Sequence, residues 1–164
     1  AVSWFNKLGT GVKIVIGIFM PFIGVVMAAV KALQYLGLVE DDEDTRLMYK
    51  AFFDRWSLPL DVTMYASAME ALIDMPTMRP QILLTDLNMP KIDGFKFLKT
   101  LREHKLFSNL HIIVMTGLSD QQIQEKGGLP HDVQLLRKPI DMEWVRGFLE
   151  ALISIRNING NKTF

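Results

Sequence analysis

The chain has 164 residues, a length that favours one domain with a small appendage. Its 18 basic and 18 acidic residues leave no net charge, which disfavours a nucleic-acid binder that works by bulk electrostatic attraction. Cysteine is absent, and this excludes disulfide scaffolds, thiolate metal sites and cysteine nucleophiles. Hydrophobic residues make up 49% of the chain, which is enough for a packed core.

The most hydrophobic stretch lies near the N-terminus, where Ile14–Val30 runs for 17 residues without a charged side chain. As an extra N-terminal helix it would span roughly 25 Å, slightly less than a bilayer core of about 30 Å. Lys13 and Lys31 flank it and could reach the head groups. Three interpretations of residues 1–31 stay open: a membrane anchor, a helix packed in an oligomer or against a partner domain, and a cleavable signal peptide.

Beyond residue 31, short apolar runs alternate with amphipathic stretches. The apolar runs predict five strands, which are Leu33–Val39, Asp61–Tyr65, Ile82–Thr85, His111–Met115 and Val133–Leu136. The amphipathic stretches predict five helices, which begin after the caps Asp44, Ser67 and Asp141 and at Gly94 and Ser119. Because the strands are almost wholly apolar and helices separate them, we expect a parallel α/β sheet covered on both faces.

Polar side chains follow the predicted strands at the points where the strands end. They are Glu40, Asp41 and Asp42 after the first strand, Asp86 after the third, Thr116 after the fourth and Lys138 after the fifth. Ligands bind beyond the carboxyl ends of the strands in open α/β sheets, so we expect these groups to converge there. Carboxylate oxygens suit Mg²⁺, and a carboxylate beside such a cation can act as a nucleophile toward phosphorus. An ammonium group and a hydroxyl can stabilise the charge on the phosphoryl oxygens.

Four motifs in this region resemble the receiver domain of two-component response regulators, and the resemblance covers Ala32–Ile155. They are LVEDDEDTR, LLTDLNMPKIDGFKFL, IIVMTG and LRKPI. Asp86 lies 45 residues after Asp41, 30 before Thr116 and 52 before Lys138, and these intervals also fit the family. The resemblance implies a flavodoxin-like (βα)5 fold, a doubly wound parallel sheet with the strand order 2-1-3-4-5, which is taken from the family.

The resemblance also implies a phosphorylation and metal site. Asp86 is similar to the aspartate that the family phosphorylates. Asp41 resembles the carboxylate that binds Mg²⁺ directly, and Glu40 is expected to assist through water. Asp86 itself and the backbone carbonyl of Asn88 complete the implied Mg²⁺ ligands.

The remaining motif positions match the family's switch, with one departure. Thr116 resembles the hydroxyl that follows the phosphoryl group, and Lys138 resembles the lysine that pairs with it. Pro139 is expected to follow a cis peptide bond. Leu135 stands three residues before the lysine, where the family often has Tyr or Phe, so the aromatic part of the switch is absent or altered. Phosphorylation itself does not need that ring.

The resemblance implies a signalling domain rather than an enzyme, placed at residues 32–156. It would receive a phosphoryl group on Asp86, with Mg²⁺, from a sensor histidine kinase or a histidine phosphotransfer protein. The modified domain would then switch a surface toward a downstream protein or a second copy of the chain, without nucleic acid. Because only a polar tail follows, residues 157–164, we expect that the output is a protein contact or that the chain is a piece of something larger. We expect a cytoplasmic domain, with membrane association only through residues 14–30.

Two other functions compete with this one. A receiver-like binding module that works without phosphorylation is favoured by Leu135. The complete set of acidic residues at the strand ends, together with Thr116 and Lys138, argues against it. A metal-dependent phosphohydrolase with an aspartyl nucleophile would commonly need a second acid two residues after Asp86, and Asn88 occupies that place.

Overall fold

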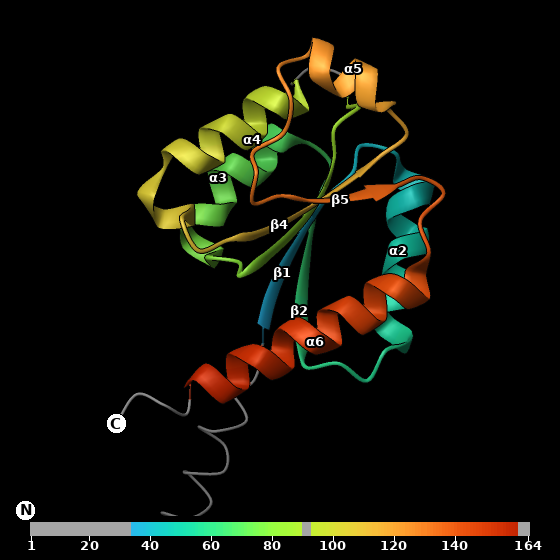
Figure 1. Ribbon diagram of the computed structural model, residues 1–164. Coiled ribbons are helices and arrows are strands. Elements are labelled where there is room, and N and C mark those ends of the chain that lie inside the picture. The colour runs from blue at the N-terminus through green and yellow to red at the C-terminus, as the bar shows by residue number, and fades with distance from the viewer. Residues whose placement is uncertain (1–33, 90–92, 161–164) are drawn as a thin grey trace, which may run out of the picture. The chain divides into compact units, whose positions relative to one another are not determined.

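In this computed structural model, which describes residues 34–89 and 93–160, strands and helices alternate along the chain (Figure 1). The strands are β1 (Gln34–Val39), β2 (Leu60–Tyr65), β3 (Ile82–Asp86), β4 (His111–Thr116) and β5 (Gln134–Arg137). The helices are α2 (Glu43–Arg55), α3 (Ala68–Met78), α4 (Gly94–Glu103), the short 3-10 helix η2 (Lys105–Phe107), α5 (Asp120–Glu125) and α6 (Met142–Gly160). Every strand predicted from the sequence is present.

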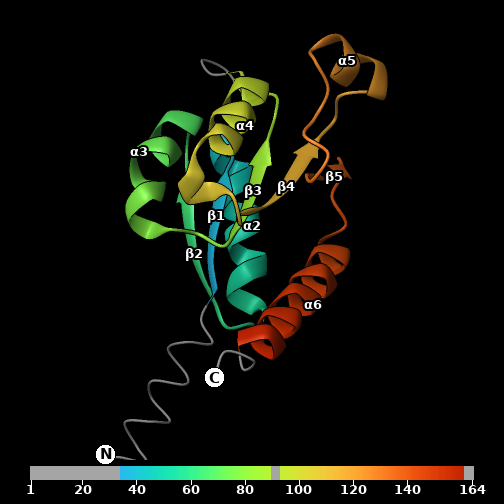
Figure 2. The ribbon, with the colours of Figure 1, turned by 60° about the vertical axis from the view of Figure 1, so that its left-hand side comes forward.

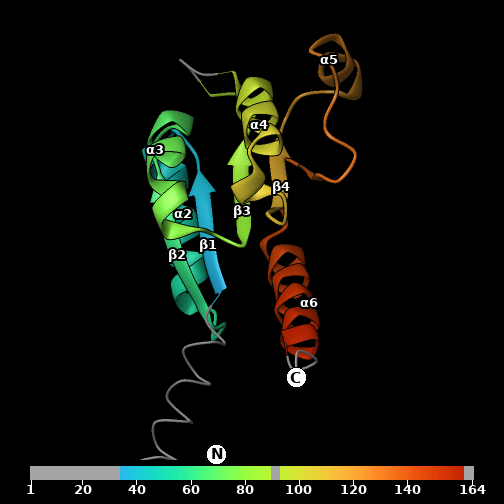
Figure 3. The ribbon, with the colours of Figure 1, turned by 90° about the vertical axis from the view of Figure 1, so that its left-hand side faces the viewer.

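The five strands form one parallel sheet in the order β2-β1-β3-β4-β5, and Figure 2 shows this order from one edge to the other. The arrowheads of β1 and β3 point the same way in Figure 3, toward the end of the sheet at which α5 lies. The predicted doubly wound, flavodoxin-like fold is therefore confirmed. The chain order reverses between β1 and β3, which places the switch point of the sheet beside their carboxyl ends.

Two layers of helices cover the sheet, with α3 and α4 on one face and α2 and α6 on the other (Figure 1). Leu83 and Leu84 illustrate how one strand serves both layers. Leu83 packs in the cluster with α3 and α4, Leu84 packs in the cluster with α2 and α6, and both side chains are fully buried. Successive residues of a strand point to opposite faces, so burial on both faces requires a continuous apolar run.

Several helix ends differ from the sequence prediction. The cap of α2 is Asp42 rather than Asp44, because the Asp42 side chain accepts a hydrogen bond from the backbone N–H of Thr45 at 2.7 Å. Helix α3 continues past Met75 to Met78 with Pro76 inside it, since a proline near the helix end removes only one backbone hydrogen bond. Helix α6 extends to Gly160, five residues beyond its amphipathic pattern and into the predicted polar tail.

The hydrophobic run Ile14–Val30 and the predictions attached to it lie outside the described residues. Within residues 34–89 and 93–160, no helix is long and apolar enough to cross a membrane.

Two glycines in helices have opposite surroundings and give a matched test of packing. A methyl group on Gly94 would lie 2.7 Å from the Cα atom of Leu87, whereas one on Gly147 would meet nothing within 4 Å. Gly94→Ala should therefore lower the free energy of unfolding by roughly 1–3 kcal/mol. Gly147→Ala should raise it by about 0.5–1 kcal/mol, because alanine loses less backbone entropy in a helix. Urea denaturation of both variants checks this pair, and equal shifts would contradict the close approach at Gly94.

Candidate functional site

The carboxyl ends of β1, β3, β4 and β5 bring the predicted polar residues to one edge of the sheet. Glu40 directly follows β1, Asp86 and Thr116 are the last residues of β3 and β4, and Lys138 directly follows β5. The strand register aligns these ends, since Asp86 pairs with Met115 and Thr116 pairs with Arg137. Residues up to 98 positions apart along the chain therefore meet at this edge.

The centre of the site is an ammonium group held between two buried carboxylates. Lys138 Nζ donates to Asp86 Oδ2 at 2.7 Å and to Glu40 Oε2 at 3.1 Å. Glu40 is 2% exposed and Asp86 is 5% exposed, so each carboxylate has little contact with water. Lys138 keeps about a third of its side chain exposed, and the cluster therefore opens to solvent through the lysine.

Burial and hydrogen bonding shift the pKa of Glu40 and that of Lys138. Burial raises the pKa of Glu40, and the hydrogen bond from Lys138 offsets only part of that rise. Burial alone would lower the pKa of Lys138, but the hydrogen bonds to Asp86 and Glu40 raise it overall. One ammonium and two carboxylates leave a net negative charge when all three are ionised. The cluster therefore favours a further cation.

The second oxygen of Asp86 and the hydroxyl of Thr116 are both held by backbone N–H groups. Asp86 Oδ1 accepts from the backbone N–H of Asn88 at 3.0 Å. Thr116 is fully buried, and its Oγ1 accepts from the backbone N–H of Leu118 at 3.1 Å. The backbone N–H of Lys138 donates to the carbonyl of Thr116 at 3.0 Å, and the peptide bond from Lys138 to Pro139 is cis. The Asp86 carboxylate and the Thr116 hydroxyl are thus each held by the backbone two residues further along the chain, and the backbone of Lys138 is held by the end of β4.

Residues 36–149 match the family described as the response regulator receiver domain. The chain belongs to this family. Receiver domains are signalling domains of two-component systems; they bind Mg²⁺ and interact with sensor histidine kinases and phosphotransfer proteins.

Curated relatives agree with this family. The response regulator Rre1 of Synechocystis is 29% identical over 119 residues, which cover 71% of this chain and 50% of Rre1. The sporulation initiation phosphotransferase F of Bacillus subtilis is 23% identical over 73% of this chain and 94% of that protein. The sensor histidine kinase TmoS of Ectopseudomonas mendocina is 31% identical, and the match spans 12% of its length. The receiver domain therefore corresponds to half or less of some longer relatives.

Solved structures match the fold. The receiver domain of the sensor histidine kinase PA1611 from Pseudomonas aeruginosa, solved with a magnesium ion coordinated in its active-site cleft, aligns with a TM-score of 0.62 and 24% identity. That alignment covers 74% of this chain and 98% of the PA1611 domain. The chemotaxis protein CheY4 of Vibrio cholerae aligns with a TM-score of 0.60 and 23% identity, over 73% of this chain and 98% of CheY4.

The structure adds one residue that the sequence analysis missed, Arg46 of α2. One nitrogen of its guanidinium, Nη1, donates to the carbonyl oxygens of Glu40 and Asp41, both at 2.7 Å. This nitrogen carries two N–H groups, so it can serve both carbonyls at once. Arg46 therefore holds the backbone of the acidic loop between β1 and α2, residues 40–42. A basic residue one turn into the helix after an acidic loop is the sequence signal that could have identified it.

The residues predicted to bind Mg²⁺ fit that ion by their chemistry. Glu40, Asp41, Asp86 and the carbonyl of Asn88 offer only oxygen atoms, which hard cations prefer. Among residues 34–89 and 93–160, no three His, Asp or Glu side chains are grouped so that they alone could hold a metal ion. An ion at this edge would therefore also draw on backbone carbonyl oxygen and water, as Mg²⁺ sites commonly do.

The position that often carries an aromatic ring in the family is occupied by a half-buried leucine. Leu135 packs against the apolar cluster between the sheet and the layer of α3 and α4, as Leu118 does. An aliphatic side chain at this position has no ring whose rotation could report on the site.

Proposed function

We propose that Asp86 accepts a phosphoryl group from a phosphohistidine donor, with Mg²⁺, and that the modified domain presents a changed surface to a partner. The arrangement of Lys138 supports this most directly. Its ammonium group lies 2.7 Å from one oxygen of Asp86, where the negative charge of a transferring phosphoryl group would develop. Asp86 is also largely buried, which keeps most of the bulk water away from the reacting carboxylate.

The step is a transfer of one phosphoryl group between two nucleophiles. An oxygen of the Asp86 carboxylate forms a bond to phosphorus, and the bond from phosphorus to the donor's imidazole nitrogen breaks. The imidazole keeps the electron pair of the broken bond and can take up a proton from solvent. A bound Mg²⁺ would supply positive charge for the phosphoryl oxygens and would be held by the carboxylates of Glu40, Asp41 and Asp86 and the carbonyl of Asn88.

Two side chains of the chain itself would bind the remaining phosphoryl oxygens. Lys138 would move its hydrogen bond from the Asp86 carboxylate to a phosphoryl oxygen and keep its bond to Glu40. The Thr116 hydroxyl can donate its own proton to another phosphoryl oxygen, because its present hydrogen bond uses it as an acceptor. Phosphorylation would thereby draw Thr116 toward Asp86. This change of contact is what would alter the surface of the domain.

The partners follow from this chemistry. The donor would be a sensor histidine kinase or a histidine phosphotransfer protein, and the recipient of the signal a downstream protein or a second copy of this chain. No nucleic acid is expected as a partner. The domain is expected in the cytoplasm, and association with a membrane would depend on residues 14–30.

The direct test is intact-mass measurement after incubation with a small phosphodonor such as acetyl phosphate, with and without Mg²⁺. We expect one phosphoryl adduct in the presence of Mg²⁺ and its loss when EDTA removes the metal. Restoring Mg²⁺ in excess over EDTA should restore the adduct, which controls for damage by the chelator. A folded protein that gives no adduct with saturating Mg²⁺ would refute the proposal.

A receiver-like binding module that works without phosphate is the second candidate, and Leu135 is the observation that favours it. Such a module would bind its partner equally well before and after treatment with phosphodonor. A phosphohydrolase is disfavoured by Asn88, since an amide at that place cannot act as the second acid.

A further inference from the structure

The loop between β4 and α5 is held at its middle residue from two sides. Leu118 donates its backbone N–H to Thr116 Oγ1 at 3.1 Å. The carbonyl of the same residue accepts a hydrogen bond from Arg137 Nη1. The Thr116 hydroxyl therefore binds the backbone N–H of Leu118, and the Arg137 side chain binds its carbonyl.

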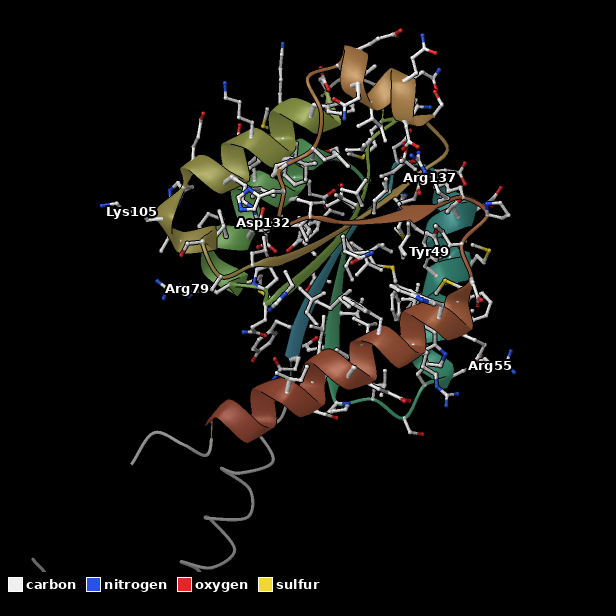
Figure 4. The ribbon with its side chains drawn as sticks, in the orientation of Figure 1. Tyr49, Arg55, Arg79, Lys105, Asp132 and Arg137 are labelled. Carbon is white, nitrogen blue, oxygen red and sulfur yellow. The ribbon has the colours of Figure 1, made fainter. Side chains whose placement is uncertain are left out.

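Arg137 also reaches the start of the next helix. Its other terminal nitrogen, Nη2, donates to Asp120 Oδ1, and Asp120 is the first residue of α5. Figure 4 labels Arg137 at the carboxyl end of β5, on the side of the segment that enters α5. One side chain on β5 thus connects the β4–α5 loop to the helix that follows it.

The backbone of Arg137 belongs to the functional edge. It pairs with Thr116 in the register of β4 and β5, and the next residue is Lys138. Successive side chains of an extended segment point to opposite sides, so Lys138 faces the carboxylates while Arg137 faces the loop and α5. A displacement at the phosphorylation site can therefore reach Arg137 in two ways. One is the peptide bond from Lys138, and the other is the pair of hydrogen bonds through Leu118.

We infer that Arg137 is the positioning residue that couples the state of Asp86 to α5, in the place of an aromatic ring at position 135. This inference rests on the proposed function. When Thr116 moves toward a phosphoryl group, Leu118 must follow or lose the acceptor of its N–H, and a half-buried N–H without an acceptor is costly. Movement of Leu118 shifts or breaks its bond to Arg137, and Arg137 carries the change to Asp120.

The ion pair between Arg137 and Asp120 is exposed enough to break and re-form easily. The Asp120 side chain is 91% exposed and that of Arg137 is 40% exposed, so water can replace either partner when the contact breaks. An exposed ion pair of this kind contributes little to stability. It can therefore be lost and regained without unfolding the domain.

The test compares hydrogen exchange of the backbone amides of residues 118–123 before and after treatment with acetyl phosphate and Mg²⁺. The variants are Arg137→Gln and Asp120→Asn, with Arg146→Gln as the control. Among the residues that the structure describes, Arg146 forms ion pairs with Glu143 and Glu150 of its own helix. Intact mass on the same samples reports whether Asp86 carries the adduct.

The wild type and Arg146→Gln should show the same phosphorylation-dependent change in exchange. In Arg137→Gln and in Asp120→Asn that change should shrink by about two- to fivefold, while the adduct still forms. A merely structural role of Arg137 would alter exchange equally in both states and leave the difference intact, and that result would overturn the inference. If the wild type forms no adduct, the proposed function fails and this inference fails with it. Because the Asp120 side chain is almost fully exposed, Asp120→Asn gives the answer even if Arg137→Gln does not fold.

Discussion

Asp86→Asn is expected to abolish the phosphoryl adduct while the domain stays folded. An amide oxygen is not a useful nucleophile toward phosphorus, and asparagine has no second charged oxygen to offer. The amide has nearly the shape of the carboxylate and can still accept the hydrogen bond from the backbone N–H of Asn88. Lys138 keeps Glu40 as its partner in this variant, so the ammonium group does not become isolated.

The measurement is intact mass after exposure to acetyl phosphate and Mg²⁺, with circular dichroism to confirm folding. Asp54→Asn is the matched control, since Asp54 is an exposed aspartate that pairs with Lys50 on the surface of α2. The control should give the wild-type adduct. A wild-type adduct on Asp86→Asn would place the phosphorylation on another residue and would refute the assignment of Asp86.

Lys138→Met should slow adduct formation by about a hundredfold or more, because it removes the cation beside the developing negative charge. Methionine has a similar length and no charge, so the change isolates the ammonium group. The variant also leaves the carboxylates of Glu40 and Asp86 buried without their shared partner. We therefore expect the free energy of unfolding to fall by roughly 1–3 kcal/mol in the absence of Mg²⁺.

The rate of adduct formation, followed by intact mass over time, checks this second prediction. Lys138→Arg should retain part of the rate, since it keeps a cation on a longer, planar head group. Lys50→Met is the control for loss of a lysine, because Lys50 pairs with Asp54 in an exposed i,i+4 pair away from the site. A wild-type rate in folded Lys138→Met would exclude the ammonium group from the transfer step.

The sequence indicated which polar residues lie together at the candidate site because the signals are local. Asp86, Thr116 and Lys138 each stand at or just after the end of an apolar run, and a parallel sheet gathers such ends at one edge. The continuous apolar character of β3 predicted burial on both faces, which the structure confirms. The strand order came from the family resemblance, since no local pattern determines which strands pair.

Helix ends were predicted less well, also for a local reason. Asp42, Glu43 and Asp44 are consecutive acidic residues, and each is able to cap a helix. In the structure the Asp42 side chain accepts the backbone N–H of Thr45. Arg46 binds the carbonyls of Glu40 and Asp41, the two residues before Asp42.

The sequence by itself determined the fold class and the candidate reactive residues, because hydrophobic periodicity and the residues within each motif can be recognised over short stretches of the chain. Only the tertiary structure decided how those residues are paired. Lys138 bridges two acids that lie 52 and 98 positions away, while its neighbour Arg137 turns to Leu118 and Asp120. Adjacent basic residues look alike in a sequence. Their roles differ because successive side chains of an extended segment point to opposite sides. The pairing of β5 with β4 places the two carboxylates on the side of Lys138 and the β4–α5 loop on the side of Arg137.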